Sequence, residues 1–483
     1  MSILKGLEPA LLWKHFEALT KIPRPSGNEA AAAQYVVSVA EQLGLEYFTD
    51  QTGNVIVRKP ATVGHQDAPT IVLQSHLDMV CEKNSDKVFD FSRDPIRLLM
   101  KGDWLTADGT TLGADNGIGV AAILAIFEDD SIVHGPLEGL FTVDEERGLV
   151  GARTVPSDAL KGRIMINLDS EDLGIFSIGC AGGRDSSITL PLNRRAAKGD
   201  VAVTLKLTGL RGGHSGIDID KGCGNAVKIL NRLLYQSAKQ LSVELVALNG
   251  GDKHNAIPRE AFAEIVVPEA EFGPLQSWFD RAMADIRVEF SPVEKGIRLE
   301  VERAMGAAPQ VLDDRSQAKL FALIFALPHG PLAMSRIIKN LVETSNNVAS
   351  VRCSDAEAKI LCSSRSSNMQ ALQATIDKLH AIADLAGAAA DQPPGYPGWM
   401  PNLESKVLKV ALETYREVTG KNAKYEAIHA GLECGIIGER FPGMDMISIG
   451  PTIKNPHSPD ESVQVDSVEA FYRHVLKMLE VLA

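Results

Sequence analysis

The sequence has only six cysteines in 483 residues, and no two of them form a Cys-x-x-Cys pair. They are Cys81, Cys180, Cys223, Cys353, Cys362 and Cys434. Cysteines scattered in this way exclude a dense disulfide framework and a thiolate zinc site. We therefore expect reduced thiols, as in a cytoplasmic protein.

Long apolar runs are also missing. No window approaches the roughly 18 uninterrupted apolar residues that a transmembrane helix needs. Near the start of the chain, Lys5, Glu8, Lys14 and His15 interrupt any apolar region of a signal peptide. This segment predicts an amphipathic helix instead, and we expect a cytoplasmic protein with no membrane partner.

Positive charge is in shorter supply than negative charge. Lysine and arginine number 49 against 62 aspartates and glutamates, which gives a formal charge of −13. This balance disfavours nucleic acid or an anionic membrane as the main partner and only weakly favours a cation. The length exceeds the roughly 250–300 residues at which single hydrophobic cores stop growing, so at least two domains are expected.

The first third of the chain alternates strand and helix patterns, which predicts an α/β sheet with helices on both faces. Helices are expected over residues 29–43 and 118–129. The expected strands are short runs rich in apolar and β-branched residues. They span residues 54–58, 70–74, 139–143 and 163–168.

The pattern changes near residue 183. The alternation of Val201, Val203, Leu205 and Leu207 indicates a half-buried strand rather than a fully buried one. The proline-rich stretch DQPPGYPGW, residues 391–399, then indicates a return linker. We predict a first domain made of residues 1–183 and 396–483, with an α+β domain over 184–395 inserted into it.

Three predicted strands are followed by histidine or carboxylate residues. His76 and Asp78 follow one strand, Glu145 and Glu146 a second, and Asp169 a third. Ligands in open α/β sheets bind at the carboxyl ends of the strands. A neutral imidazole there can bind zinc while a carboxylate holds its other N–H group.

Asp115 and His457 complete this pattern. Asp115 opens a helix within LGADNG, and His457 lies in a proline-flanked loop. Each such residue alone has an ordinary interpretation, as a helix cap, a hydrogen-bonded turn histidine or part of a solvated acidic turn. Together they predict a metal cluster. Imidazole and carboxylate without thiolate suit zinc, with Mn²⁺ or Co²⁺ as substitutes.

The motifs SHLDMV, GTTLGADNGIG, LDSED, GCAGG, GGHSG, NAIPREAFA, IHAGLECG and PHSPDE resemble those of the bacterial aminoacyl-histidine dipeptidases (peptidase D). These carnosinase-like enzymes belong to the dinuclear zinc peptidases and deacetylases. The resemblance runs from PRPSGNE near the start to PHSPDE near the end. It implies a discontinuous zinc-peptidase catalytic domain, with a mixed central sheet flanked by helices, and an inserted lid.

The resemblance also implies roles for these residues and two Zn²⁺ per subunit. His76 and Asp169 would hold one zinc, Glu146 and His457 the other, and Asp115 would bridge them. Asp78 would orient His76, and Glu145 would activate a zinc-bridged water.

Further roles follow from the same resemblance. His214 would stabilise the oxyanion, Asn255 and Arg365 would hold the substrate carboxylate, and Glu433 would bind the α-amine of a dipeptide. His214 could instead cap a helix or pair locally, and a solvated arginine is the ordinary outcome for a position such as Arg365.

We therefore expect metal-dependent hydrolysis of dipeptides, Xaa-His dipeptides such as carnosine among them. Deacylation of N-acyl amino acids by the same chemistry is one alternative, and it would not need Glu433. A non-catalytic binding protein is another, and it would not need Glu145. A homodimer is expected, and whether His214 acts within its own subunit or on its neighbour is left open, since the predicted lid is about twice the length of one βαββαβ unit.

Overall fold

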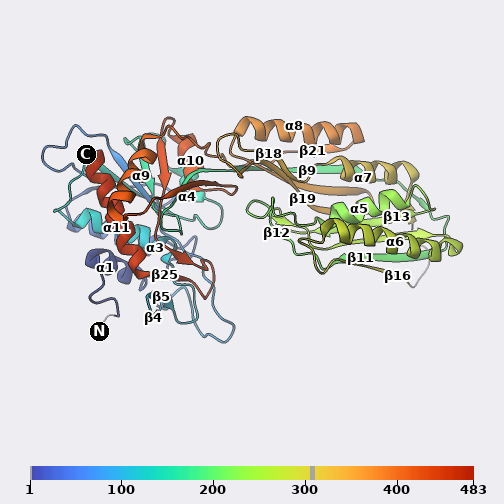
Figure 1. Cartoon of the computed structure of the whole chain (residues 1–483), viewed down its shortest axis with the longest axis horizontal. Coiled ribbons are helices and arrows are strands. Elements are labelled where there is room, and N and C mark those ends of the chain that lie inside the picture. Colours follow the sequence, from blue (N-terminus) through green and yellow to red (C-terminus); the bar gives the residue numbers. More distant parts are fainter. Residues whose placement is uncertain (1–2, 305–309) are drawn as a thin grey trace. The chain divides into compact units, whose positions relative to one another are not determined.

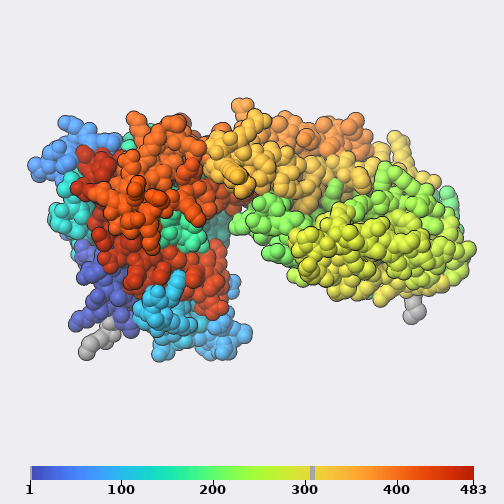
Figure 2. Space-filling model, viewed as in Figure 1, coloured from blue at the N-terminus to red at the C-terminus, as the bar shows by residue number. Residues whose placement is uncertain are grey.

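The computed structural model describes residues 3–304 and 310–483. The chain divides into two compact units. The first unit comprises Met1–Cys180, Trp399–Ala427 and Leu432–Ala483, and the second comprises Ala181–Gly398 and Ile428–Gly431. The blue N-terminal and red C-terminal parts of the chain pack together in the first unit, and the second unit runs from green through yellow to the orange of α8 (Figures 1 and 2). That these units act as a catalytic domain and a lid stays a prediction.

The first unit is built on a mixed sheet of eight strands. Its order is β1 (Glu46–Thr49), β2 (Val55–Lys59), β6 (Leu137–Thr142), β3 (Ile71–His76), β7 (Ile164–Asn167), β23 (Asp445–Ser448), β8 (Ile175–Cys180) and β22 (Lys424–Ile428). β3 runs parallel to both β6 and β7, and β23 runs parallel to β7, whereas β2 is antiparallel to β6. The carboxyl ends of β3, β6 and β7 therefore meet at one edge, where α/β proteins bind their ligands.

Helices flank this sheet. They are α1 (Ala10–Leu19), α2 (Ala30–Gln42), α3 (Ala114–Glu128), α4 (Val150–Thr154), α9 (Lys406–Thr419), α10 (Glu433–Arg440) and α11 (Val465–Leu482). α3 is buried almost all round, as a helix without a polar face must be. It packs against α1 and β3. The predicted α/β fold class is confirmed.

A small sheet in the same unit carries the loop of His457. Its order is β24 (Ile453–Lys454), β25 (Ser462–Gln464), β5 (Trp104–Ala107) and β4 (Leu98–Lys101). The hairpin between β24 and β25 thus presents residues 455–461 from the edge of a paired sheet.

The second unit contains a nine-stranded sheet with four helices. Eight strands follow the order β16 (Arg298–Arg303), β11 (Val201–Thr208), β15 (Ala261–Val267), β13 (Glu244–Gly251), β19 (Val342–Cys353), β20 (Glu357–Ser366), β9 (Gly182–Pro191) and β21 (Ala389–Asp391), and β18 (Gly330–Met334) pairs with β19. The helices are α5 (Ala226–Ser237), α6 (Glu269–Phe290), α7 (Asp314–Ala326) and α8 (Met369–Ala386). Two short ladders join β10 (Arg194–Ala196) to β17 (Gln310–Leu312) and β12 (Gly213–His214) to β14 (Ala256–Ile257). The alternating burial of β11 is the one its sequence predicts.

This unit has an internal repeat. β11, α5, β13, β15, α6 and β16 form one βαββαβ half, with strand order β16-β11-β15-β13. β9, α7, β19, β20, α8 and β21 form the other half, with the mirrored order β19-β20-β9-β21. The halves join where β13 pairs with β19, at Gly250 with Val351 and Gly251 with Ser350. One chain therefore builds a continuous sheet from two copies of the same motif.

Among the described residues, no helix is long and apolar enough to cross a membrane.

Candidate metal centre

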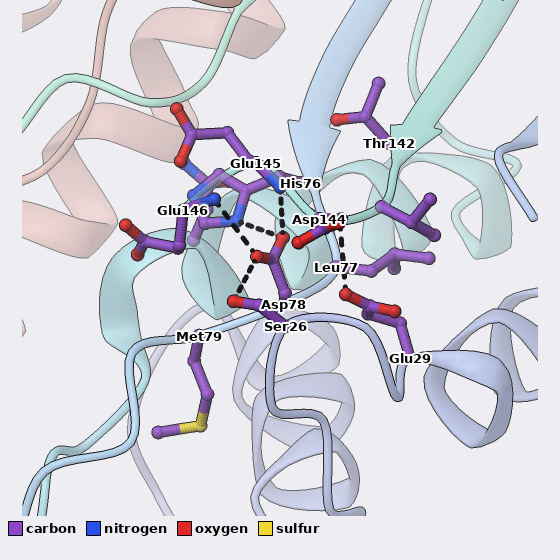
Figure 3. Close-up of polar contacts among 12 residues, drawn as sticks. Ser26, Glu29, His76, Leu77, Asp78, Met79, Thr142, Asp144, Glu145 and Glu146 are labelled. Carbon is purple, nitrogen blue, oxygen red and sulfur yellow. Dashed lines mark hydrogen bonds and ion pairs between the residues drawn. The ribbon is translucent and has the colours of Figure 1, made fainter. Parts of the chain in front are cut away.

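The strand ends of the first unit bring histidine and carboxylate side chains to one place. His76 is the last residue of β3, is almost fully buried, and lies opposite Thr142 of the parallel β6. Glu145 and Glu146 follow β6 by a short turn, and Asp169 follows β7. Figure 3 shows the turn of Glu145 and Glu146 beside His76.

Asp115 lies between two histidines. Its Oδ1 is 3.1 Å from His76 Nε2, and its Oδ2 is 3.1 Å from His457 Nε2. Asp169 Oδ1 is 3.4 Å from His76 Nε2, and Glu146 Oε2 is 3.1 Å from His457 Nε2. The five residues thus form two histidine–carboxylate triplets that share Asp115.

These spacings fit metal coordination. With zinc–ligand bonds of roughly 2.0–2.2 Å, the ligand atoms of a tetrahedral site lie roughly 3.3–3.6 Å apart. Glu146 Oε1 is buried and has no hydrogen-bond partner in the described part of the chain. In residues 3–304 and 310–483, three of the four groups of ligand atoms close enough to share an ion combine a histidine with carboxylates, the fourth contains carboxylates alone, and none contains cysteine. The residues therefore fit a pair of cations that accept nitrogen and oxygen ligands.

Negative charge dominates the electrostatics of this centre. Hydrogen bonds that the His457 ring donates to Asp115 and Glu146 raise the pKa of His457 to about 11. Burial lowers the pKa of His76, but its carboxylate neighbours, Asp169 first, raise it well above the usual value. Burial raises the pKa of Asp169. These shifts describe a strongly negative potential, which attracts cations.

Asp78 connects His76 to the turn that carries Glu145 and Glu146. Its Oδ1 lies 3.3 Å from His76 Nδ1 and accepts a hydrogen bond from the Glu145 amide at 3.1 Å. Its Oδ2 accepts from the Glu146 amide at 3.1 Å and from Ser26 Oγ at 2.7 Å (Figure 3). Although burial raises the pKa of Asp78, the hydrogen bonds, that of His76 first, lower it well below its usual range. Asp78 is thus an ionised carboxylate that can fix the orientation of the His76 ring.

Glu145 has the electrostatics of a proton acceptor. Burial raises its pKa well above the usual value, and the neighbouring Asp169, Glu433 and Glu146 raise it further. One of its carboxylate oxygens lies within 4.8 Å of ligand atoms of His76 and Glu146. A carboxylate with a raised pKa beside the ligands is suited to take a proton from a water molecule.

Glu433 also faces this centre, from the first turn of α10. Its Oε2 accepts hydrogen bonds from Gln74 Nε2 at 2.6 Å and from Thr142 Oγ1 at 2.8 Å. Its Oε1 is buried without a hydrogen-bond partner among the described residues. Burial and the charge of Asp169 raise the pKa of Glu433 to about 7.

Gln74 and Asn167 support Glu433 and were not predicted from the sequence. Asn167 Nδ2 donates to Gln74 Oε1 at 2.5 Å, so the two amides continue a buried network from β7 through β3 to Glu433. The signal that could have found them is a polar residue inside an otherwise apolar buried strand, because buried polar groups need partners.

His214 lies in the second unit, and backbone amides of the turn that follows it fix the tautomer of its ring. His214 Nδ1 accepts hydrogen bonds from the amides of Gly216 at 3.2 Å and Ile217 at 3.1 Å. Burial lowers the pKa of His214, and the charge of Arg365 lowers it further. The neutral ring therefore carries its proton on Nε2, which leaves an N–H donor directed away from its own turn.

Arg365 is buried in the same unit, at 5% exposure. One terminal nitrogen donates to Tyr396 Oη at 2.7 Å, and its Nε is buried without a hydrogen-bond partner in the described chain. The structure gives Arg365 no carboxylate partner among residues 3–304 and 310–483. A buried guanidinium in this state is suited to an anionic group of a ligand.

Asn255 is linked to His214 through the backbone. Its carbonyl accepts from the Ser215 amide at 2.8 Å, and its side chain is exposed. The second unit therefore contains His214, Asn255 and Arg365, whereas the first contains Glu433 and the candidate metal ligands.

Comparison with known proteins gives full-length matches. Residues 72–481 match peptidase family M20/M25/M40. The chain is 42% identical over 481 residues to the cytosol non-specific dipeptidase of Escherichia coli (strain K12), covering 99% of each. It is also similar to the crystal structure of aminoacylhistidine dipeptidase from Vibrio alginolyticus, with a TM-score of 0.94, 41% identity, and coverage of 99% and 98% of the two chains. Aminopeptidase PepT from Bacillus cereus ATCC 10987 matches at a TM-score of 0.58 and 16% identity, over 99% of each chain, which is a likeness of fold.

Proposed function

The chain belongs to peptidase family M20/M25/M40, a family of metallopeptidases, and we propose that it hydrolyses dipeptides, Xaa-His dipeptides such as carnosine among them. One observation carries the proposal: two histidine–carboxylate triplets share Asp115 beside the proton acceptor Glu145. Two full-length relatives are named as dipeptidases, one of them for aminoacyl-histidine substrates.

We propose two zinc ions as the cofactor, with Co²⁺ or Mn²⁺ as substitutes. His76 and Asp169 would hold one ion, Glu146 and His457 the other, and Asp115 both. Bound zinc supplies a Lewis acid for the scissile carbonyl and lowers the pKa of a bound water. The spacing and chemistry of the ligand atoms support this assignment.

The side chains around the ligands divide the remaining work. Glu145 takes the proton of the attacking water and delivers it to the leaving amine, as a carboxylate with a raised pKa can do. The Nε2–H group of His214 donates to the oxyanion. Asp78 holds the His76 ring in place.

The substrate ends are assigned to two buried groups with unused hydrogen-bonding capacity, Glu433 and Arg365, and to the exposed side chain of Asn255. Glu433 offers its second carboxylate oxygen to the α-amine of the dipeptide. Arg365 and Asn255 bind the α-carboxylate of the C-terminal residue. Recognition of both charged ends favours an unblocked dipeptide over longer or acylated substrates.

We also propose a cytoplasmic homodimer in which His214 serves its own subunit. The E. coli relative carries a cytosolic name, which supports the location. In the first half of the second unit, β13 already pairs with β19 of the same chain, so this edge is not available to a second subunit. The second half of the unit thus pairs with the strand edge that the first half alone would leave free.

A substrate panel tests the function. Purified protein loaded with zinc is assayed on carnosine, other Xaa-His dipeptides, dipeptides without histidine, and N-acetyl amino acids. We expect hydrolysis of the dipeptides, loss of activity on exhaustive chelation, and recovery with zinc. Hydrolysis of N-acetyl amino acids alone would make the chain a deacylase, and activity that persists after metal removal verified by elemental analysis would refute the metal assignment.

A further inference from the structure

The loop that leads into α3 is held by a buried carboxylate from a distant part of the chain. Glu461 accepts hydrogen bonds from four consecutive backbone amides. These are Leu112 at 2.7 Å, Gly113 at 2.9 Å, Ala114 at 2.7 Å and Asp115 at 3.3 Å. Glu461 is 1% exposed, so these bonds form away from water. The backbone position of the shared residue Asp115 is therefore set by Glu461.

A buried guanidinium holds the same loop by its carbonyl side. Arg24, 2% exposed, donates from Nη2 to the Gly113 carbonyl at 2.5 Å. Its Nη1 donates to the carbonyls of Leu77 at 3.0 Å and Asp78 at 2.8 Å. Arg24 thus ties the loop before Asp115 to the loop after His76.

Gly113 allows both charged groups to approach. Its φ of +71° lies in the left-handed region, and a Cβ there would meet Arg24 Nη2 at 2.5 Å and Met79 Sδ at 2.8 Å. A larger residue would therefore separate Arg24 from the loop.

Glu461 also belongs to the loop of the second histidine. It lies four residues after His457, its amide donates to the Ser458 carbonyl at 3.0 Å, and its carbonyl accepts from Thr106 Oγ1 at 2.7 Å. The three loops that carry His76, Asp115 and His457 are consequently connected through two side chains, Arg24 and Glu461.

We propose that Arg24 and Glu461 are positioning residues that hold the Asp115 loop in register with the loops of His76 and His457 and so determine metal affinity. The proposal rests on the metal-dependent function proposed above. A carboxylate shared by two ions would present one oxygen to each, and Asp115 already places one oxygen 3.1 Å from each of the two candidate histidine ligands. A displacement of a few tenths of an ångström would lengthen one of these contacts. Groups that orient metal ligands from outside the coordination sphere typically change metal affinity by about 10–100-fold when they are removed.

The alternative is that Arg24 and Glu461 only stabilise the fold. A matched control variant distinguishes this structural role from the proposed positioning role. Glu138 is also 1% exposed and accepts from the amides of Lys161 and Gly162, both at 2.9 Å, and it pairs with Arg58 at 3.1 Å. It lies at the start of β6, the end away from the candidate centre. Glu138→Gln therefore removes a buried carboxylate that holds backbone amides without touching the Asp115 loop.

The experiment measures Zn²⁺ and Co²⁺ affinity by competition with a chelator, the Co²⁺ absorption spectrum, and urea unfolding of metal-free protein. No peptide substrate is needed. Glu461→Gln should weaken metal binding by about 10–100-fold and alter the Co²⁺ spectrum. Amide hydrogen exchange at residues 112–115 should be faster, since the amides lose charged acceptors. Glu138→Gln should keep the metal affinity within about twofold of wild type, even if it lowers the free energy of unfolding as much as Glu461→Gln does.

Arg24→Lys provides a second variant. It keeps the positive charge, but a single ammonium group lacks the planar fork with which the guanidinium contacts the carbonyls of two loops. It should show the same loss of affinity, and it carries the test if Glu461→Gln does not fold. Wild-type affinity and spectrum in the folded variants would overturn the inference and leave the proposed function intact. Failure of the wild-type protein to bind metal would overturn both.

Discussion

The state of Glu433 leads to a prediction about substrate choice. One carboxylate oxygen accepts hydrogen bonds from Gln74 and Thr142, and the other is buried with no partner in the described part of the chain. Glu433→Gln keeps the shape of the side chain. Its carbonyl oxygen can still accept from Gln74 and Thr142, which leaves an NH₂ group at the position proposed for the dipeptide amine.

The size of the effect follows from the bond that is lost. A hydrogen bond to a charged group contributes about 1.5–3 kcal/mol, which corresponds to about 10- to 150-fold in kcat/KM. We therefore expect Glu433→Gln to lower kcat/KM by that factor for carnosine and other unblocked dipeptides. N-acetyl derivatives of the same dipeptides lack the ammonium group, so their slow hydrolysis should change by less than about threefold.

The assay compares the two substrate classes with the same metal-loaded preparations. Glu138→Gln is the control, because it makes the same substitution at an equally buried position away from the centre. An equal loss for blocked and unblocked substrates would show that Glu433 supports the structure of the site. An unchanged kcat/KM for unblocked dipeptides would show that Glu433 does not contact the amine.

Three further predictions concern catalysis, subunit arrangement and pH. Glu145→Gln should lower kcat by about 10²–10⁴ while the metal content measured by elemental analysis is unchanged. His214→Ala should lower kcat more than it raises KM, and mixing it with Glu145→Gln under subunit exchange should restore no activity if His214 serves its own subunit. His474 is buried, donates to the Ala411 carbonyl at 3.0 Å, and burial lowers its pKa from 6.5 to about 4. Between pH 6.5 and 4 the His474 ring is protonated in the unfolded chain but not in the folded one, so the free energy of unfolding falls as the pH falls through this window. His474→Gln should remove about 3 kcal/mol of that loss, measured by urea unfolding of metal-free protein.

Each of these has a contrary result. Loss of metal in Glu145→Gln would mean that the roles of Glu145 and Glu146 are exchanged. Recovered activity in the mixed dimers would place His214 on the neighbouring subunit, and full turnover by His214→Ala would refute its oxyanion role. A pH dependence of stability unchanged by His474→Gln would show that this ring is not protonated differently in the two states.

The sheet of the first unit was predictable because its signals are local. Runs such as residues 70–74 are apolar and β-branched, and they became the fully buried β3 and its parallel neighbours β6 and β7. Parallel strands share one edge, so a polar residue directly after each strand had to lie near the others. The closeness of His76 and Asp169 follows from this rule, whereas Glu146 reaches the same place through the turn after β6.

His457 did not follow from any local pattern. It lies in a hairpin loop more than 300 residues after Asp115, so its membership of the cluster was inferred from residue type and a proline-flanked loop, and its pairing with Glu146 only from the resemblance of PHSPDE to a known motif. The hydrogen bonds between Glu461 and the backbone amides of residues 112–115 could not be predicted either, because side-chain bonds to a distant backbone leave no periodic pattern in the sequence.

Two elements of the second unit show why helix boundaries and strand pairings are hard to predict from the sequence. α6 begins at Glu269 and contains Pro274, a residue that normally ends or kinks a helix when it lies beyond the first turn. The Glu269 amide donates to Asp200 Oδ1 at 2.7 Å, and Arg303 pairs with the Glu269 carboxylate. These tertiary contacts support the first turn despite the proline. β9 pairs with β20 and β21 across the whole first half of the unit, a separation that no sequence pattern specifies.

The charge around the candidate centre links its structure to its chemistry. Many carboxylates surround the two histidines, and the buried guanidinium of Arg24 lies beside them. They include Asp78, Asp115, Glu145, Glu146, Asp169, Glu171, Glu433 and Glu461. Two divalent cations would offset much of this negative charge, and a substrate ammonium beside Glu433 would offset more. Because the like charges repel one another at short range, each carboxylate that a cation or an ammonium group neutralises also makes its neighbours less costly to keep ionised. Metal binding should therefore lower the pKa of Glu433 and keep this carboxylate ionised for the amine of the substrate.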